Sequence, residues 1–192
     1  MIAAMKERTS IFFWRRLNAP GHDACRFSSR AEGYELLGSS VFLESRRVCQ
    51  LGYRVIANES FLTQRACVSG FIGTTRVDLA IRASAAGRWT VNGVEQPAPA
   101  GCVDLDLGFT PATNLLAVRR LRLPVGKEAQ APAAYLAFPQ SKLSLLEQRY
   151  KRLSRTTYDY EAPRFGYRGV LRVAATGAVI EYPNLFSMEP AK

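Results

Sequence analysis

The sequence is poor in the residues that catalytic and metal sites use. His22 is the only histidine among 192 residues, and the four cysteines form no closely spaced pair. A structural zinc site needs such pairs, and a Ser–His or Cys–His nucleophile would depend on His22 alone. The motifs of α/β-hydrolases, zinc peptidases, dinucleotide-binding folds, phosphate loops and calcium loops are all missing. We therefore predict no catalytic residue, no metal and no cofactor.

A long apolar run is also missing. The longest stretch without a charged residue has 13 residues, 129–141, and two prolines interrupt it. A membrane-spanning helix needs about 20 apolar residues, so none is predicted. Charged residues at positions 6–8 stand where a signal peptide would have its apolar core. We expect a cytoplasmic protein whose four cysteines are reduced; these are Cys25, Cys49, Cys67 and Cys102.

Negative charge is scarce. The chain has 26 Lys and Arg against 16 Asp and Glu, which gives a formal net charge of +10. The arginines are mostly scattered among apolar residues, with one denser cluster at Arg149, Lys151, Arg152 and Arg155. The sequence has no zinc finger, KH loop or RNP motif. The pattern favours an ordinary solvated basic surface. The alternative is recognition of an anionic partner, whether a lipid headgroup, a phosphate or nucleic acid.

Short runs of Val, Ile, Leu, Phe and Tyr recur about every ten residues between Gly, Pro, Asn or Ser, which is typical of an all-β sandwich or barrel. Residues 76–82 alternate strictly between polar and apolar side chains, and Asn92-Gly93 predicts a tight hairpin turn. The predicted strands are 11–17, 24–29, 34–44, 49–58, 61–70, 76–83, 88–91, 102–108, 113–123, 131–138, 147–153, 156–161, 167–175 and 179–182.

Residues 141–146 are the exception to this strand pattern. Leucines at helical spacing and a Ser144–Glu147 capping box predict a helical turn there. With so little helix, a single sheet would have to curl closed to protect its edges. We predict one domain over residues 1–192, a large and strongly curved antiparallel sheet of about 13–15 strands that closes into a β-barrel.

Asp104 and Asp106 are a carboxylate pair of interest, because residues i and i+2 of a strand share a face about 6.5–7 Å apart. That distance suits a glycosidase pair, but acidic side chains that face arginines on an outer surface are far commoner. Pro111 predicts a chain reversal after this strand, and the next strand would then return beside it. In that register Asp104 and Arg119 are diagonal neighbours, and we expect them to form an ion pair.

Aromatic side chains crowd the last third of the chain. Tyr158 and Tyr160 would share one face of a strand, and Tyr182 precedes a proline. Tyrosine has an apolar ring and a polar hydroxyl, which suits the mouth of a wet cavity or a sugar-stacking surface as well as an ordinary core. The aromatic residues are Tyr135, Phe138, Tyr150, Tyr158, Tyr160, Phe165, Tyr167, Tyr182 and Phe186.

Several segments, in this order, resemble a family of bacterial proteins named "putative glycolipid-binding". They cover roughly residues 50–186 and are 87–93, 101–107, 110–114, 119–121, 148–150, the Tyr158/Tyr160 strand, Phe165 and 181–183. Ala117 and Phe61 depart from the pattern, where proline and tryptophan are usual. The resemblance implies a curved antiparallel sheet closed into a barrel, similar to lipoprotein carriers, with a lipid or glycolipid inside. It transfers no catalytic residue.

We therefore predict a non-enzymatic protein that binds a glycolipid or another amphiphile, with the acyl part in the barrel interior and the headgroup at its mouth. Burying each CH₂ there would contribute about 0.8 kcal/mol. The residues predicted to bind the headgroup are Trp89, Arg119, Arg120, Tyr150 and Tyr182.

Two alternatives remain open at this point. One is a hydrolase or isomerase acting through Asp104 or Asp106, and the other is a basic adaptor for nucleic acid or an acidic protein. A wide apolar cavity favours the carrier, a cleft with converging carboxylates favours the enzyme, and a filled barrel with one basic face favours the adaptor.

Overall fold

The computed structural model describes residues 9–137 and 139–190. Residues 1–8 and Phe138, on which parts of the sequence argument depended, lie outside the described residues. Across the described ranges the secondary structure is almost entirely β, with 14 strands in one sheet and three in a second. The prediction of a mainly β protein is confirmed.

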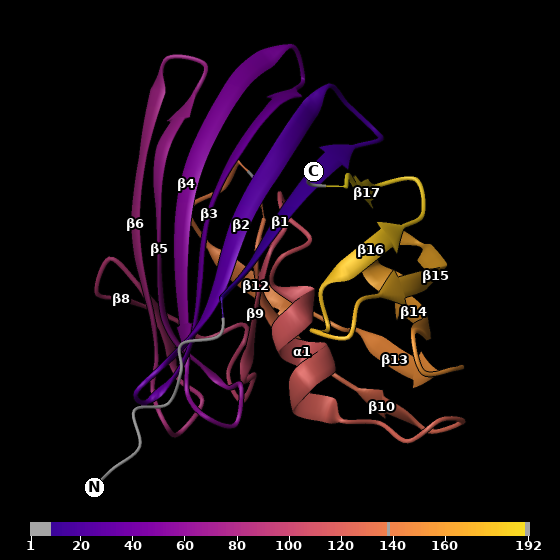
Figure 1. The fold of residues 1–192 in the computed structure, drawn as a ribbon. Helices are drawn as coiled ribbons and strands as arrows, with labels where there is room; N and C mark the ends of the chain where they lie inside the picture. Colours follow the sequence, from indigo (N-terminus) through magenta and orange to yellow (C-terminus); the bar gives the residue numbers. More distant parts are fainter. Residues whose placement is uncertain (1–8, 138, 191–192) are drawn as a thin grey trace, which may run out of the picture.

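The first half of the chain forms a row of long antiparallel hairpins. Its strands are β1 (Thr9–Arg16), β2 (Gly21–Arg30), β3 (Gly33–Glu44), β4 (Arg47–Ala57), β5 (Thr63–Ile72) and β6 (Thr75–Ala83). Each pairs with the next along the chain. Buried and exposed side chains alternate along much of their length because successive residues of a strand point to opposite faces. Figure 1 shows these strands side by side as one curved wall.

A short hairpin of β7 (Trp89–Val91) and β8 (Val94–Gln96) extends the wall beyond β6. Asn92 and Gly93 at its tip have φ angles of 49° and 81°. Positive φ at both central positions is what a type I′ turn requires. The tight turn predicted at Asn92-Gly93 is confirmed.

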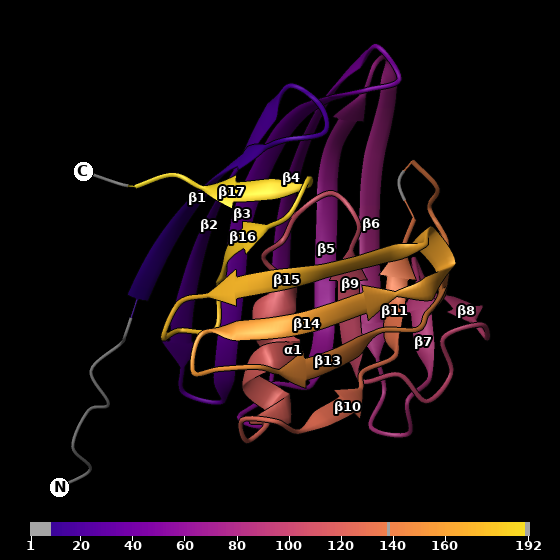
Figure 2. The same cartoon turned by 90° about the vertical axis from the view of Figure 1, so that its right-hand side faces the viewer.

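In the other direction from β1, the same sheet continues into the C-terminal part of the chain. The order runs through β17 (Phe186–Met188), β16 (Val179–Tyr182), β15 (Tyr167–Val173), β14 (Thr157–Ala162), β13 (Arg149–Arg152) and β10 (Glu128–Gln130). A 3-10 turn, η1 (Pro163–Phe165), joins β14 to β15. Figure 2 shows β13, β14 and β15 passing in front of the space that β3–β6 close from behind. One sheet therefore supplies two facing layers.

A second sheet and the helix lie between these layers. Strands β9 (Asp104–Leu107) and β12 (Leu143–Leu146) flank β11 (Ala133–Leu136), and β9 runs parallel to β11. A parallel pair needs a long crossover, which residues 108–132 provide with helix α1 (Asn114–Leu121). Within the described ranges, no helix has the length and hydrophobicity needed to cross a membrane.

The prediction of a closed barrel is wrong. The large sheet begins at β10 and ends at β8, and no pairing joins these two edge strands. The sheet does not close because other elements fill the space between its two layers. Helix α1 and the second sheet occupy the space between the layers, and their apolar side chains complete the core there. The large sheet has 14 strands, within the predicted 13–15, and the second sheet of three strands was not predicted.

Two local predictions are wrong as well. The strand predicted at 113–123 is instead helix α1, whose Leu, Ala and Arg residues favour a helix. The helical turn predicted at 141–146 is instead strand β12. Ser144 does not form a capping box there, and its hydroxyl accepts a hydrogen bond from Arg164 at 2.7 Å. In both segments the apolar pattern is too short to distinguish the two periods.

The core includes Trp89, which was predicted from the sequence to bind the headgroup. Trp89 is fully buried, and its Nε1 donates to the carbonyl of Cys102 at 3.0 Å. Cys25, Cys49 and Cys102 are buried thiols, Cys67 is exposed, and all four are free.

Candidate functional site

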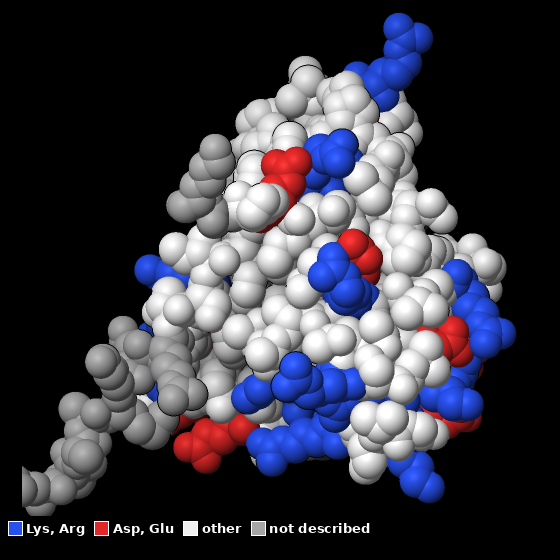
Figure 3. All heavy atoms as spheres, turned by 45° about the vertical axis from the view of Figure 1, so that its right-hand side comes forward, with Lys and Arg blue, Asp and Glu red and all other residues white. Residues whose placement is uncertain are grey.

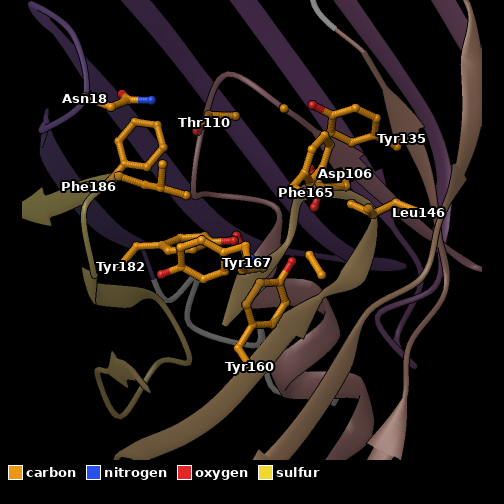
Figure 4. Close-up of a pocket in the computed structure, with 14 residues that line it drawn as sticks. Asn18, Asp106, Thr110, Tyr135, Leu146, Tyr160, Phe165, Tyr167, Tyr182 and Phe186 are labelled. Atoms are coloured by element: carbon orange, nitrogen blue, oxygen red, sulfur yellow. The ribbon is translucent and has the colours of Figure 1, made fainter. Parts of the chain in front are cut away.

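A cavity of about 370 Å³ opens where β14–β17 of the large sheet meet the second sheet and the start of α1. We call it the tyrosine cavity. Figure 4 shows aromatic rings and a few polar groups directed toward this common space. The aromatic residues that line it are Tyr135, Tyr160, Phe165, Tyr167, Tyr182 and Phe186.

Three tyrosines from adjacent strands form one side of the cavity. The ring centroids of Tyr160 and Tyr182 lie 5.6 Å apart, and those of Tyr167 and Tyr182 lie 5.3 Å apart, both edge to face. The hydroxyl of Tyr167 donates to the carbonyl of Pro183 at 2.9 Å, which fixes its ring. Burial raises the pKa of all three tyrosines, so their hydroxyls stay protonated at neutral pH.

Asp106 on β9 brings a carboxyl group into the cavity. Gln148 Nε2 donates to its Oδ2 at 3.2 Å, and no Lys or Arg of the described residues forms an ion pair with it. Burial raises its pKa to about 7, against the opposing effect of the Gln148 hydrogen bond and with a smaller contribution from the charge of Asp104. At neutral pH both the carboxylic acid and the carboxylate form of Asp106 are therefore populated.

Gln148 connects this carboxyl to the tyrosines. Its Oε1 accepts hydrogen bonds from the hydroxyls of Tyr150 and Tyr160, each at 3.1 Å. Asn114 at the start of α1 donates through Nδ2 to the Tyr150 hydroxyl at 2.8 Å. Gln148 is only 3% exposed, so these bonds form a buried network that holds Asp106 and Tyr160 in place.

Asp104, two residues before Asp106, has a different environment. Arg120 of α1 binds both of its carboxylate oxygens, with Nε donating to Oδ1 at 2.9 Å. The predicted Asp104–Arg119 pair is wrong, because residues 114–121 form helix α1 and the residue after Arg119, Arg120, faces β9 instead. Asp104 does not line the cavity. The two carboxylates therefore do not converge in a cleft, as the hydrolase alternative required.

Another buried carboxyl, that of Asp23, lies behind the cavity wall. Asp23 Oδ2 accepts hydrogen bonds from the Thr110 hydroxyl at 2.6 Å and from the Tyr53 hydroxyl at 2.9 Å. Thr110 lines the cavity, and Asp23 is 1% exposed. Burial raises the pKa of Asp23 to about 7. This network positions the loop between β9 and α1 that forms one wall of the cavity.

The tyrosine cavity brings together only part of the predicted headgroup site. Tyr182 lines it, whereas Tyr150 is buried in the hydrogen-bond network and Trp89 lies in the core. Arg120 is paired with Asp104, and Arg119 lines a different pocket.

Three polar residues at the cavity escaped the sequence analysis. Asn114 and Thr110 line it, and Gln148 supports it from behind. Their only signal was that they fall inside two of the family-like segments, 110–114 and 148–150, because isolated amides and hydroxyls carry no spacing motif. Across the described residues, no group of three or more His, Cys, Asp or Glu could hold a metal ion.

Comparison with known proteins gives two matches. A family model described as "Putative glycolipid-binding" matches residues 11–188. The crystal structure of a DUF1089 family protein from Pseudomonas aeruginosa is similar, with a TM-score of 0.75 and 25% sequence identity. That likeness covers 96% of this chain and 93% of the other. No curated protein matches the sequence.

Proposed function

The chain belongs to the glycolipid-binding family, and we propose that its tyrosine cavity binds the sugar headgroup of a glycolipid. The proposal rests on Asp106, a carboxyl group that lies among aromatic rings and forms no ion pair with any described Lys or Arg. Aromatic rings pack against the apolar faces of a sugar ring, and a carboxyl, an amide and hydroxyls bind its hydroxyl groups. Asp106, Asn114 and Thr110 supply those polar groups.

The headgroup bound here is uncharged. Among the described residues that line the cavity there is no Lys or Arg, and the predicted Arg119 and Arg120 lie elsewhere. The guanidinium carbon of Arg164 lies 5.8 and 5.9 Å from the centres of the Tyr135 and Phe165 rings, but Arg164 does not line the cavity. An anionic headgroup would meet Asp106 without a compensating charge, which is unfavourable in a partly buried site. Neutral sugar hydroxyls can donate to the ionised carboxylate and accept from the protonated acid, so they suit both forms of Asp106.

The acyl chain stays outside the fold. The space between the two layers, where the barrel prediction placed it, contains α1 and the second sheet with buried side chains such as Leu105, Leu107 and Leu115. The cavity of about 370 Å³ lies near the lower end of ligand pockets, roughly 300–1,000 Å³. We therefore propose a protein that binds the headgroup alone and catalyses no reaction, rather than a carrier that encloses a whole lipid.

The proposal is tested by titrating the protein calorimetrically with a panel of octyl glycosides, the matching methyl glycosides, and an octyl ether that has no sugar. We expect at least one glycoside to bind and the ether not to bind. Methyl and octyl forms should differ by less than about tenfold, whereas a buried octyl chain would strengthen binding by several orders of magnitude. Binding of no glycoside, or equal binding of the ether, would overturn the proposal.

Asp106→Asn examines the same site without changing its size. At about pH 8, where the carboxylate form of Asp106 predominates, we expect glycoside binding to weaken by about tenfold or more, because an amide is a poorer acceptor than a carboxylate. Asp78→Asn is the matched control, since Asp78 is an exposed residue of β6. Equal affinity of the two variants for the glycoside would show that Asp106 does not contribute to binding.

A further inference from the structure

A second pocket, of about 420 Å³, lies at the C-terminal end of α1. We call it the arginine pocket. Arg119 and Arg122 come from the end of the helix, and Arg152 and Arg155 come from β13 and the turn that follows it. Tyr158 and the turn at 173–177 close the other side. Figure 3 shows basic side chains gathered across the lower part of one face of the molecule.

The charges of this pocket have no internal compensation. Among the described residues no carboxylate lines it, and none of its four arginines forms an ion pair with a carboxylate there. Elsewhere in the same layer Arg149, Arg168 and Arg172 each pair with a carboxylate on β14 or β16. Gathering unpaired like charges costs electrostatic energy, which a bound anion would offset.

Arg152 is held in a fixed orientation. Its Nε donates to the carbonyl of Ser154 at 3.0 Å, and its two terminal nitrogens donate to the carbonyls of Leu123 and Arg155 at 2.8 and 2.9 Å. A guanidinium group has five N–H donors, so each terminal nitrogen keeps one free N–H after these bonds form. Two donors on one rigid plane remain for a ligand.

Arg119 is positioned by packing. A Cβ added to Gly177 would lie 3.1 Å from its Cγ and Cδ, so the turn at 173–177 fits closely against its aliphatic part. Its guanidinium carbon lies 5.2 Å from the centre of the Phe61 ring. The helix dipole also stabilises a cation at the C-terminal end of a helix. That effect does not account for Arg152 and Arg155, which belong to a strand and a turn.

We infer that the arginine pocket binds a multiply charged phosphate group, such as a diphosphate or a phosphate monoester. Guanidinium groups match the geometry of phosphate oxygens, and an arginine cannot lose its charge to relieve the crowding. The ligand is either a phosphate carried by a lipid headgroup or a soluble phosphate, since both present the same oxygens. The inference does not depend on glycoside binding in the tyrosine cavity.

The test is calorimetric titration with inorganic pyrophosphate. The double variant Arg119→Ala/Arg155→Ala removes two exposed arginines of the pocket, and we expect it to weaken binding by about tenfold or more. Arg65→Ala/Arg82→Ala is the matched control. It removes the same net charge from two exposed arginines that lie opposite each other on β5 and β6. The control should bind within about twofold of the unmodified protein. No binding of pyrophosphate, or equal losses in both double variants, would overturn the inference.

The source of the phosphate is decided with phosphatidylcholine vesicles made with and without phosphatidic acid. Binding only to the phosphatidic acid vesicles, and its displacement by pyrophosphate, would identify a lipid phosphate. Pyrophosphate binding without vesicle binding would identify a soluble phosphate. If the double variant does not fold, as judged by its unfolding curve, Arg155→Ala alone should still weaken pyrophosphate binding severalfold, and unchanged binding would contradict the assignment.

Discussion

The two ends of helix α1 present opposite arrangements of charge. At its start, the tyrosine cavity contains a carboxyl group without a cation, and at its end the arginine pocket contains cations without a carboxylate. Asn114 lines the first and Val118 the second, which is about one helical turn or 6 Å along the axis. The carboxyl group of Asp106 and the arginines of the arginine pocket are therefore not paired with each other.

Burial explains which charge occupies which end. Asp106 can take up a proton, so its raised pKa lets it sit without a cation among aromatic rings. An arginine stays charged at any ordinary pH, so burying it without a partner is costly. Arg119, Arg122 and Arg155 are accordingly exposed. A group that titrates suits a neutral ligand, and a group of fixed charge suits an anion.

Between the two ends lies a third arrangement, the Asp104–Arg120 pair, and breaking it should have the largest effect on stability. Asp104 is 4% exposed, so Arg120→Leu leaves a buried carboxylate without its partner. We expect the free energy of unfolding in urea to fall by about 3–5 kcal/mol. Arg119→Leu, the neighbouring and exposed control, should cost less than about 1 kcal/mol. Equal losses would show that Asp104 does not depend on Arg120.

The hydrogen-bond network beneath the tyrosine cavity should give the next largest effect. Gln148→Leu keeps much of the side-chain volume and removes the donor to Asp106 and the acceptor of the Tyr150 and Tyr160 hydroxyls. We expect a loss of roughly 2–3 kcal/mol in urea unfolding, since these partners are left unsatisfied in a buried site. Gln130→Leu on exposed β10 should change stability by less than about 0.5 kcal/mol. A loss no larger than this control would mean that water replaces the network.

The two halves of the fold differed in how far the sequence could predict them. The hairpins from β1 to β8 follow from alternation and turn residues, because each strand pairs with its neighbour in sequence and the signal is local. Closure of a barrel is not local. It depends on what fills the interior, and the chain between 104 and 146 fills it with a parallel pair and a helix that a strand pattern cannot reveal.

The same limit applies to the candidate site. Tyr182 was predicted to bind the headgroup, and Asp106 was singled out, although for the alternative of catalysis. Asn114, Thr110 and Gln148 come from a helix, a loop and the residue before β13, so only the folded chain brings them together. The predicted Asp104–Arg119 pair failed by one residue, since a helix and a strand present successive side chains at different angles.

A smaller effect on stability is expected from the titration of Asp106. Its pKa in the folded protein is about 7, raised from 3.8, so the folded state holds this proton more tightly than the unfolded chain does. Stability should therefore fall as the pH rises from about 4 to about 7. Asp106→Asn should reduce this slope and stabilise the protein at about pH 8 by roughly 1–3 kcal/mol. The slope that remains belongs to Asp23, whose pKa is also about 7, and to Asp104, whose pKa burial raises as well. An unchanged slope in urea unfolding at several pH values would exclude Asp106 as its source.

The smallest expected effect is that of salt on glycoside binding, and it separates the two ends of α1 most directly. Raising the salt from about 0.1 M to about 1 M shortens the Debye length from about 10 Å to about 3 Å. Pyrophosphate binding should weaken by about tenfold or more over this range, because it depends on four fixed charges near the surface. Glycoside binding should change by less than about twofold, since hydrogen bonds and ring packing to a neutral sugar involve no net charge. A parallel loss of both affinities in the same titrations would mean that the tyrosine cavity also binds a charged group, and the division of roles along α1 would then be wrong.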